Sequence, residues 1–256
     1  MSIFNITKQS RIVILIMAIL VLAGLGIAKN YYGNINKSED PRIVDAKKMY
    51  GRYNQLAMEG SAEEVLQLLD SIETIYAQYD YYRHSFETGV LYNNRAAIYL
   101  TEGLQCKHDS ILKKSMFKLA KENAIRSIEI YQGWMDAEGC LSEQELQKCV
   151  SSAFSQESLK ANEKQHGMIV KKRIKDVLTA QYETKRRLSV AYTNLGIIQR
   201  HTNEPEKAIE CYTKAIDLWD RNHSAKNNLN MILGRPAVKQ SMLQRIFPPK
   251  KEEKRG

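Results

Sequence analysis

Glycine and proline are scarce in this chain of 256 residues, which contains 13 Gly and 5 Pro. Both residues interrupt helices, so long segments without them that are rich in Ala, Leu, Glu, Lys and Gln favour helices over strands. A hydrophobic content of 43% is enough to build a core and excludes a wholly disordered chain. We therefore expect an all-α protein.

Motifs of catalysis and metal binding are also lacking. The chain has no Gly-x-x-x-x-Gly-Lys-Ser/Thr phosphate loop, no Gly-x-Ser-x-Gly elbow and no Gly-x-Gly-x-x-Gly turn. Its five histidines are scattered, and no two of them form a His-Glu-x-x-His motif. Paired carboxylates stand near predicted helix starts, where they interact with the helix dipole. The sequence predicts a protein that is not an enzyme, with no catalytic residue, metal site or cofactor.

Four cysteines are present, and none belongs to a Cys-x-x-Cys motif. In an oxidising compartment Cys140 and Cys149 are the nearest pair in sequence and could form a disulfide. In a reducing compartment all four are buried or free thiols, as are most cysteines without metal-binding spacing. The sequence favours free thiols and leaves the disulfide open.

A charge-free apolar run of seventeen residues extends from Ile12 to Ala28. As a helix it covers roughly 26 Å, close to the thickness of the hydrocarbon layer of a bilayer. One interpretation is a single-pass membrane anchor, with Lys8 and Arg11 before it and tyrosines after it. The other is a cleaved signal peptide. Both place the rest of the chain on the extracytoplasmic side, although Lys29 and other basic residues beyond the run leave a cytoplasmic placement open.

The remaining composition divides the chain into segments. Residues 1–30 are the anchor or signal peptide, residues 31–41 a polar linker, residues 42–236 a helical domain and residues 237–256 a basic, disordered tail. Within the domain we expect one helix that ends at Gly60, a capping box of Ser61 with Glu64, and another of Ser142 with Glu145. A long helix is expected over residues 168–200, followed by one that begins near Pro205.

Positive charge is concentrated in the last third of the chain. Residues 171–256 contain 19 Lys and Arg against 9 Asp and Glu, a net charge of +10, whereas the whole chain carries +9. Such a block attracts anionic lipid or an acidic protein. Nucleic acid is not expected, because most tyrosines occupy packing positions rather than the basic block. The predicted basic patch comprises Lys171, Lys172, Arg173, Lys175, Lys185, Arg186 and Arg187.

Small and aromatic residues recur at helical spacing between residues 191 and 219. Tyr192 and Leu195-Gly196 lie on one predicted helix, and Ala208 and Tyr212 lie on the next. This pattern resembles the tetratricopeptide repeat, whose hairpins pack through small residues beside aromatic ones. A second unit resembles it with Tyr92, Ala96 and Tyr99 on the first helix and Ala124, Ile128 and Tyr131 on the second, separated by about twenty extra residues. The hairpin before it fits the pattern weakly, with Met49, Tyr53, Val65, Leu69 and Ile72 at the matching positions.

The resemblance implies a short helical solenoid, interrupted by an insertion, that binds a protein or peptide on its concave inner face. Asn94 matches the position that supplies an Asn to the carboxylate clamp of chaperone-binding repeats, but its expected basic companions are replaced by Gly51 and Asn194. The candidate partner-binding residues are Asn94, Tyr99, Asn194 and Gln199. The leading hypothesis is a membrane-tethered adaptor. The alternative is an assembly component of a membrane complex that uses basic residues between 171 and 187.

Overall fold

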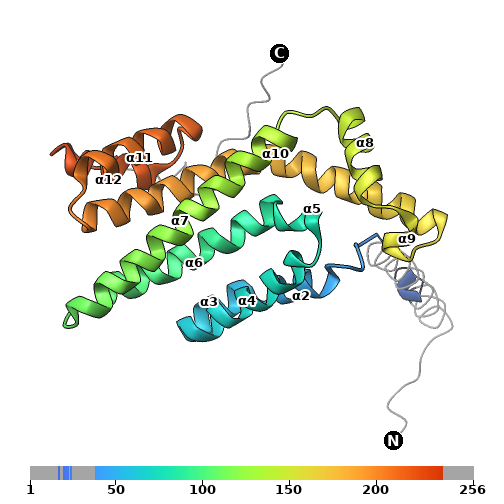
Figure 1. Ribbon diagram of the computed structural model, residues 1–256, viewed down its shortest axis with the longest axis horizontal. Helices are drawn as coiled ribbons and strands as arrows, with labels where there is room; N and C mark the ends of the chain where they lie inside the picture. The colour runs from blue at the N-terminus through green and yellow to red at the C-terminus, as the bar shows by residue number, and fades with distance from the viewer. Residues whose placement is uncertain (1–16, 18–19, 23, 25–37, 239–256) are drawn as a thin grey trace, which may run out of the picture. The chain divides into compact units, whose positions relative to one another are not determined.

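The computed structural model describes residues 17, 20–22, 24 and 38–238, and every regular element in this part of the chain is an α-helix (Figure 1). The expectation of an all-α protein is therefore confirmed for these residues. The chain divides into two compact units. The first contains the chain up to Val44 and the segment Ser142–Asp176, and the second contains Asp45–Leu141 and the chain from Val177 onward. The sequence-based interpretation treated residues 42–236 as one domain and did not include this division.

The first hairpin of the second unit consists of α2 (Val44–Gly51), α3 (Tyr53–Glu59) and α4 (Ala62–Ala77). The single helix expected before Gly60 is interrupted at Arg52, directly after Gly51, because a glycine inside a helix weakens it. Gly60 ends α3 as expected. The capping box is also confirmed, since the Ser61 hydroxyl accepts from the Glu64 backbone N–H and the Glu64 carboxylate accepts from the Ser61 N–H.

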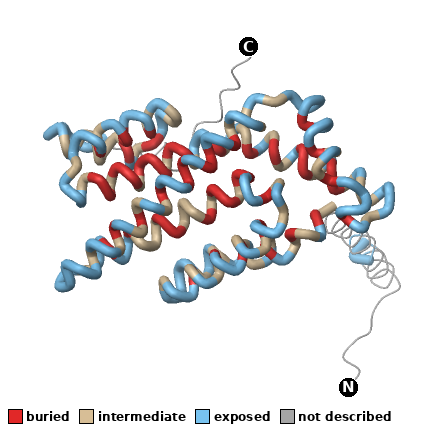
Figure 2. The backbone as a smooth tube through the Cα atoms, in the orientation of Figure 1, coloured by how far each residue is buried: buried red, intermediate tan, exposed pale blue. Residues whose placement is uncertain are grey.

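The second hairpin pairs α6 (Phe86–Gln105) with α7 (Ser110–Glu138), and the four-residue helix α5 (Asp80–Arg83) precedes it. The sequence pattern predicted that the polar segment beginning at Thr101 joins the two helices of this hairpin, as part of about twenty extra residues between them. The structure instead places its first residues in α6 and leaves a turn of only four residues, 106–109, before α7. The extra residues therefore lengthen both helices. In Figure 2 buried residues recur along both helices among exposed ones, as amphipathic helices require.

The third hairpin pairs the C-terminal part of α10 (Glu163–His201) with α11 (Pro205–Leu218). Pro205 occupies the first turn of α11, as expected. A further helix, α12 (His223–Ile232), follows, and its N-cap Asn222 is buried. The Asn222 side-chain amide donates to the hydroxyls of Ser189 and Thr193 on α10, at 2.8 and 2.9 Å. These bonds hold α12 against the last hairpin, as is expected of a capping helix at the end of a repeat stack.

The first unit contains α8 (Glu143–Ala153), α9 (Gln156–Leu159) and the N-terminal part of α10. The expected capping box of Ser142 and Glu145 begins α8. The Arg42 guanidinium lies 4.4 Å from the centre of the Phe154 ring and pairs with Asp40 at 2.8 Å. The apolar core of this unit comprises Ile43, Leu146, Val150, Phe154, Leu159, Ile169, Val170 and Ile174.

No helix among the described residues is long and apolar enough to cross a membrane. The anchor predicted over residues 12–28 lies outside the described residues, apart from Met17, Leu20–Leu22 and Gly24. The predicted tail over residues 237–256 lies outside them as well, apart from its first two residues.

Candidate functional site

Two glycines bring the helices of the second and third hairpins into close contact. A Cβ atom added to Gly196 on α10 would lie 2.6 Å from the Tyr212 ring on α11. A Cβ atom added to Gly89 on α6 would lie 2.6 Å from the Tyr131 ring on α7. Both tyrosines are fully buried. The same glycine–tyrosine contact therefore occurs in both hairpins, which identifies them as two copies of one packing unit.

This equivalence corrects the register predicted for the second hairpin. Gly89 corresponds to Gly196, whereas the sequence pattern put Ala96 at that position. Tyr131 corresponds to Tyr212, whereas the pattern put Ile128 there. Ala96 lies seven residues, or two helical turns, beyond Gly89 and so on the same helix face, which explains why the wrong register fitted the spacing. Ala96 and Ala208 are buried, as expected of small residues between helices.

The first helices of the three hairpins, α2, α6 and α10, are joined by a row of polar contacts between neighbours. The Asn94 amide on α6 donates to the Tyr50 hydroxyl on α2 at 3.3 Å. The Asn194 amide on α10 donates to the Asn93 side-chain oxygen on α6 at 3.2 Å. We call Tyr50, Asn93, Asn94 and Asn194 the inner row, and all four residues are half-buried. The structure thus brings two of the four predicted binding residues into one row.

Aromatic packing fixes the α2 end of the inner row. The Tyr50 ring stacks on the Tyr53 ring of α3, with centroids 5.5 Å apart and planes 2° from parallel. Burial, with a smaller contribution from the neighbouring Tyr50, raises the pKa of Tyr53 to about 12. The Tyr53 phenol is therefore neutral at physiological pH. A tyrosine hydroxyl can accept one hydrogen bond and donate another, so the Tyr50 hydroxyl that accepts from Asn94 can also act as a donor.

Ion pairs fix α6 against α4. The buried Arg95 guanidinium contacts Asp70 at 2.6 Å and Glu73 at 2.5 Å. The Tyr92 hydroxyl also donates to Glu73, at 2.6 Å. These contacts lie on the side of α6 that faces α4. They therefore fix the orientation of α6 about its own axis, and this orientation directs Asn93 and Asn94 toward α10 and α2.

The other two predicted binding residues lie elsewhere on their helices. Gln199 is 7% exposed, and its side-chain oxygen lies 3.1 Å from the Cys211 sulfur on α11. It is therefore part of the packing between α10 and α11. Tyr99 lies seven residues after Tyr92, on the side of α6 that faces α4. Tyr99 follows Asn94 by five positions, and Gln199 follows Asn194 by five positions. Five positions along a helix turn a side chain by about 140° from its companion, so neither residue shares the face of the inner row.

The sequence pattern identified Asn94 and Asn194 but missed Tyr50 and Asn93. The adjacent asparagines of "YNNR" were a usable signal, because neighbouring residues on a helix point to different neighbours. Tyr50 gave no such signal, since its role depends on the contact between α2 and α6.

The predicted basic patch is divided between the two units, and not all of it is exposed. In the first unit Lys171 and Lys175 are exposed, whereas Arg173 is 3% exposed and so belongs to the interior, which corrects its assignment to a surface patch. Lys172 pairs with Glu39 and with Asp176, both at 3.2 Å. Its charge is thus partly neutralised within the protein.

In the second unit only part of the patch faces solvent. Lys185 and Arg186 are exposed, and Arg186 pairs with Glu183 at 3.0 Å. The Arg187 guanidinium lies 5.6 Å from the centre of the Phe86 ring, and one of its terminal nitrogens is buried without a hydrogen-bond partner.

The four cysteines lie in the described part of the chain and are free thiols: Cys140 and Cys149 are exposed, Cys106 is half-buried and Cys211 is buried. Burial raises the pKa of the Cys211 thiol to about 11. Within the described residues, no group of three or more His, Cys, Asp or Glu side chains is arranged to hold a metal ion.

A family model of the tetratricopeptide repeat matches residues 189–222. The match covers the Gly196–Tyr212 contact and ends at Asn222, which caps α12. Comparison with curated proteins and with solved structures gave no match. The chain therefore contains a tetratricopeptide repeat, a kind of repeat that generally binds proteins or peptides.

Proposed function

We propose that this repeat-containing chain is a membrane-tethered adaptor that binds an extended peptide segment of a partner protein along the inner row. The observation that carries the proposal is the pair of contacts Tyr50–Asn94 and Asn93–Asn194, which align side-chain amides from neighbouring inner helices. Side-chain amides at regular intervals suit the backbone of an extended segment, which offers N–H and C=O groups at regular intervals too.

The inner row keeps unused hydrogen-bonding capacity. A side-chain amide offers two N–H donors and an oxygen with two lone pairs. Asn94 uses one donor for Tyr50, and Asn194 uses one donor for Asn93. The row contains no Lys or Arg, so it provides no charged partner for a terminal carboxylate. We therefore assign it to main-chain groups within a peptide rather than to a carboxylate clamp.

The proposed tether is the apolar run over residues 12–28. Its described residues Met17, Leu20, Val21 and Leu22 are helical and between 59% and 67% exposed, as apolar side chains that face lipid would be. A tether limits the adaptor to partners at the membrane surface and raises their effective concentration there. Both interpretations of the run, as an anchor and as a signal peptide, send the body across the membrane, so we place it on the extracytoplasmic side.

Site-specific photo-crosslinking tests the proposal. Thr101 is exposed and lies seven residues after Asn94, on the same face of α6, so a photoreactive residue there is close to the proposed ligand. Crosslinked partners are identified by mass spectrometry from intact membranes. We expect Asn94→Ala with Asn194→Ala to reduce crosslinking.

The matched control for this experiment is Asn123→Ala on α7. Asn123 is half-buried, and its amide donates to the Leu119 carbonyl of its own helix. The control should crosslink as the wild type does. Equal crosslinking by the control and by the double variant would refute the inner row as the binding surface.

The alternative, an assembly component that binds anionic lipid or an acidic subunit, uses the exposed residues of the basic patch. Such binding weakens steeply with ionic strength, whereas binding by neutral amides does not. Replacing Lys171 and Lys175 with Gln should therefore leave binding at the inner row intact. If the partner dissociates at raised salt, and if the replacement of Lys171 and Lys175 also abolishes its binding, the alternative is favoured.

Protease protection tests the proposed side of the membrane. Protease is added first to intact cells and then to cells in which only the plasma membrane has been opened. A C-terminal tag on an extracytoplasmic body should be digested in the intact cells if it lies outside the cell, and should resist protease in both steps if it lies in a closed compartment. Digestion that begins only when the plasma membrane is opened would contradict an extracytoplasmic body.

A further inference from the structure

A groove with a volume of about 760 Å³ lies in the second unit, between the first half of α7 and the turn that joins α10 to α11. Its α7 side includes Ile111, Lys114, Lys118 and Lys121, and its other side includes Glu204. We call it the lysine groove. The inner row is not part of its wall, so a ligand of this groove goes beyond the function proposed above.

Positive charge is in excess along the lysine groove. Three lysines line it, against the single carboxylate of Glu204. Lys121 pairs with Glu204 at 2.7 Å, and Lys207, from outside the groove, pairs with the same carboxylate. Glu204 is therefore already neutralised, and the charges of Lys114 and Lys118 are in excess.

The ammonium groups of these two lysines are accessible to a ligand. Lys114 is exposed, and it has no hydrogen-bond or ion-pair partner among the described residues. Lys118 lies 3.9 Å from a carboxylate oxygen of Glu122, and the two side chains of this pair are 77% and 57% exposed. So long and so exposed an ion pair contributes little, and a ligand carboxylate can replace it.

A neighbouring histidine reports the positive charge of this end of the hairpin. The His201 ring stacks on Phe117, which lines the groove, with centroids 5.7 Å apart. The Lys113 ammonium lies 5.9 Å from the centre of the same Phe117 ring. Burial, followed by the charges of Arg200 and Lys113, lowers the pKa of His201. The surroundings of the groove therefore disfavour a further cation and attract an anion.

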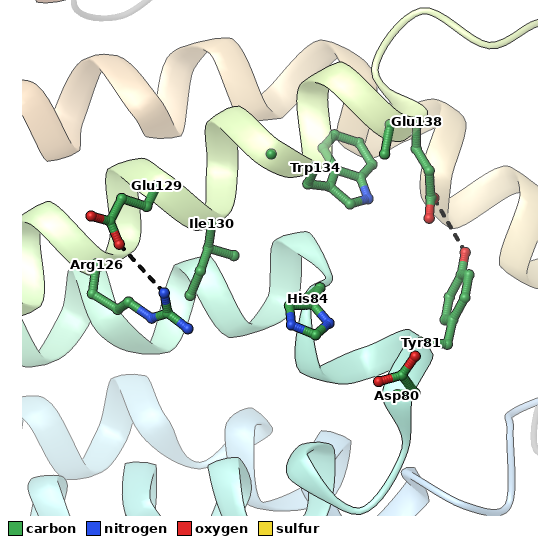
Figure 3. Close-up of a pocket in the computed structure, with 10 residues that line it drawn as sticks. Asp80, Tyr81, His84, Arg126, Glu129, Ile130, Trp134 and Glu138 are labelled. Atoms are coloured by element: carbon green, nitrogen blue, oxygen red, sulfur yellow. Dashed lines mark hydrogen bonds and ion pairs between the residues drawn. The ribbon is translucent and has the colours of Figure 1, made fainter.

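The cavity between α5 and α7, shown in Figure 3, contains charges of both signs that contact partners within its wall. The Arg126 guanidinium lies 3.4 Å from Glu129 on the same helix. The Glu138 carboxylate accepts a hydrogen bond from the Tyr81 hydroxyl at 3.2 Å. That cavity therefore lacks the excess of one charge that characterises the lysine groove.

The spacing of the two lysines suits an extended chain. Lys114 and Lys118 are four residues apart on α7, which corresponds to a rise of about 6 Å. Alternate residues of an extended chain point to the same side and are about 6.6 Å apart. Two carboxylates at alternate residues can therefore reach both lysines. Ile111 is 82% exposed on the same face of α7, and it offers apolar contact to a further residue on that side of the ligand.

We propose that the lysine groove binds an extended acidic segment of a partner protein, in which Asp or Glu at two alternate residues pairs with Lys114 and Lys118. A membrane surface fits less well, because a flat layer of headgroups does not enter a groove between a helix and a turn. Single-stranded nucleic acid requires exposed aromatic rings for stacking, and Phe117 in this groove is 4% exposed. A phosphate group is the competing ligand, and the experiment includes it.

Methyl NMR of the full chain in detergent micelles tests the proposal. Labelling the isoleucine δ1-methyl groups with ¹³C gives a signal for Ile111, which Ile111→Val assigns by removing it. The probe is acetyl-Leu-Ala-Glu-Ala-Glu-Ala-amide, titrated to about 10 mM because two exposed ion pairs are expected to give only millimolar affinity. One matched probe has Gln in place of both Glu residues, and another has the two Glu residues adjacent. Inorganic phosphate is the last probe.

We expect the acidic probe to shift the Ile111 signal in a saturable manner, while the signal of Ile72, which is buried in α4, stays in place. The Gln probe should bind about fivefold or more weakly, because it has no charge to pair with the lysines. The probe with adjacent Glu residues should also bind more weakly, since adjacent side chains of an extended chain point to opposite sides.

Two pairs of lysine variants separate the groove from net charge. Lys114→Gln with Lys118→Gln should weaken the acidic probe by about fivefold or more. Lys148→Gln with Lys164→Gln removes the same charge from exposed lysines that do not line the groove, and it should change the affinity by less than about twofold. Unchanged isoleucine signals outside the groove show that each variant is folded.

The absence of a saturable Ile111 shift, or equal affinity for the Gln probe, would overturn the proposal. Equal affinity for the probe with adjacent Glu residues would contradict pairing at alternate residues. Tighter binding of inorganic phosphate would assign the groove to a phosphate group instead, and equal losses in the two pairs of lysine variants would exclude the groove as the binding site. Asn94→Ala with Asn194→Ala should leave the Ile111 shift unchanged, so failure at this groove and failure at the inner row are distinguishable.

Discussion

Replacing Gly196 with alanine tests the close approach of α10 and α11. The added Cβ would lie 2.6 Å from Cε1 and 2.8 Å from Cδ1 of the Tyr212 ring, closer than carbon atoms pack in proteins. Tyr212 has no exposed surface, so its ring cannot move into solvent. Overpacking of this kind costs about 1–3 kcal/mol. Alanine recovers about 1 kcal/mol as a better helix former than glycine.

With the gain in helix propensity subtracted, the free energy of unfolding should fall by up to about 2 kcal/mol. Urea unfolding followed by circular dichroism measures this change. In a thermal scan a loss of about 2 kcal/mol corresponds to a Tm that is lower by about 4–8 °C. Gly89→Ala should behave in the same way, since its Cβ would meet the buried Tyr131 ring at the same distance.

Gly133→Ala is the matched control. Gly133 is an exposed residue within α7, and an added Cβ there meets no atom within 4 Å. Alanine should therefore stabilise the protein by about 0.5–1 kcal/mol through helix propensity alone. In a Tyr212→Leu background, Gly196→Ala should lose most of its penalty, because the ring that it meets is gone. Gly196→Ala as stabilising as Gly133→Ala would refute the packing that defines the repeat.

Three further predictions follow from charged and titratable groups. Arg95→Met, which ends two ion pairs to α4, should lower the free energy of unfolding by about 1–3 kcal/mol in urea titrations, and no loss would show that these pairs do not hold α6. Hydrogen bonds from Lys121 and Lys207 lower the pKa of Glu204 to about 2, so its stabilising effect is present above pH 4.5 and is lost as the pH falls toward 2. NMR titration should measure this low pKa, and Glu204→Gln should remove the change in stability between pH 4.5 and pH 2. A Glu204 pKa near its ordinary value would contradict the hydrogen bonds from Lys121 and Lys207. Cys211 should react with iodoacetamide at least about tenfold more slowly than the exposed cysteines until the chain unfolds, and mass spectrometry of the alkylated peptides would detect an equal rate.

The parts of the fold that local chemistry determines were predictable from sequence. Ser61 with Glu64 satisfies the free N–H groups at the start of a helix whatever the helix packs against, and so does Ser142 with Glu145. Pro205 lacks an N–H that the first turn of a helix does not need. These signals located the starts of α4, α8 and α11, because each depends on residues within one turn.

The parts that depend on contacts between helices were not predictable in the same way. A spacing of seven residues preserves the helix face, so Ala96 fitted the repeat pattern as well as Gly89, and only the Tyr131 ring distinguishes them. Similarly, Tyr99 and Gln199 are polar residues near the expected binding positions. Their actual places, on other sides of α6 and α10, follow from what each helix packs against.

The most direct test of the inner row is calorimetric titration of the full chain with the partner segment identified by crosslinking. Asn94→Ala with Asn194→Ala removes two side-chain amides, each worth about 0.5–1.5 kcal/mol as a hydrogen-bond donor or acceptor. The Kd of the double variant should therefore be about 5-fold to 150-fold weaker than that of the wild type, with Asn123→Ala unchanged. A Kd for the double variant equal to that of Asn123→Ala would contradict binding at the inner row.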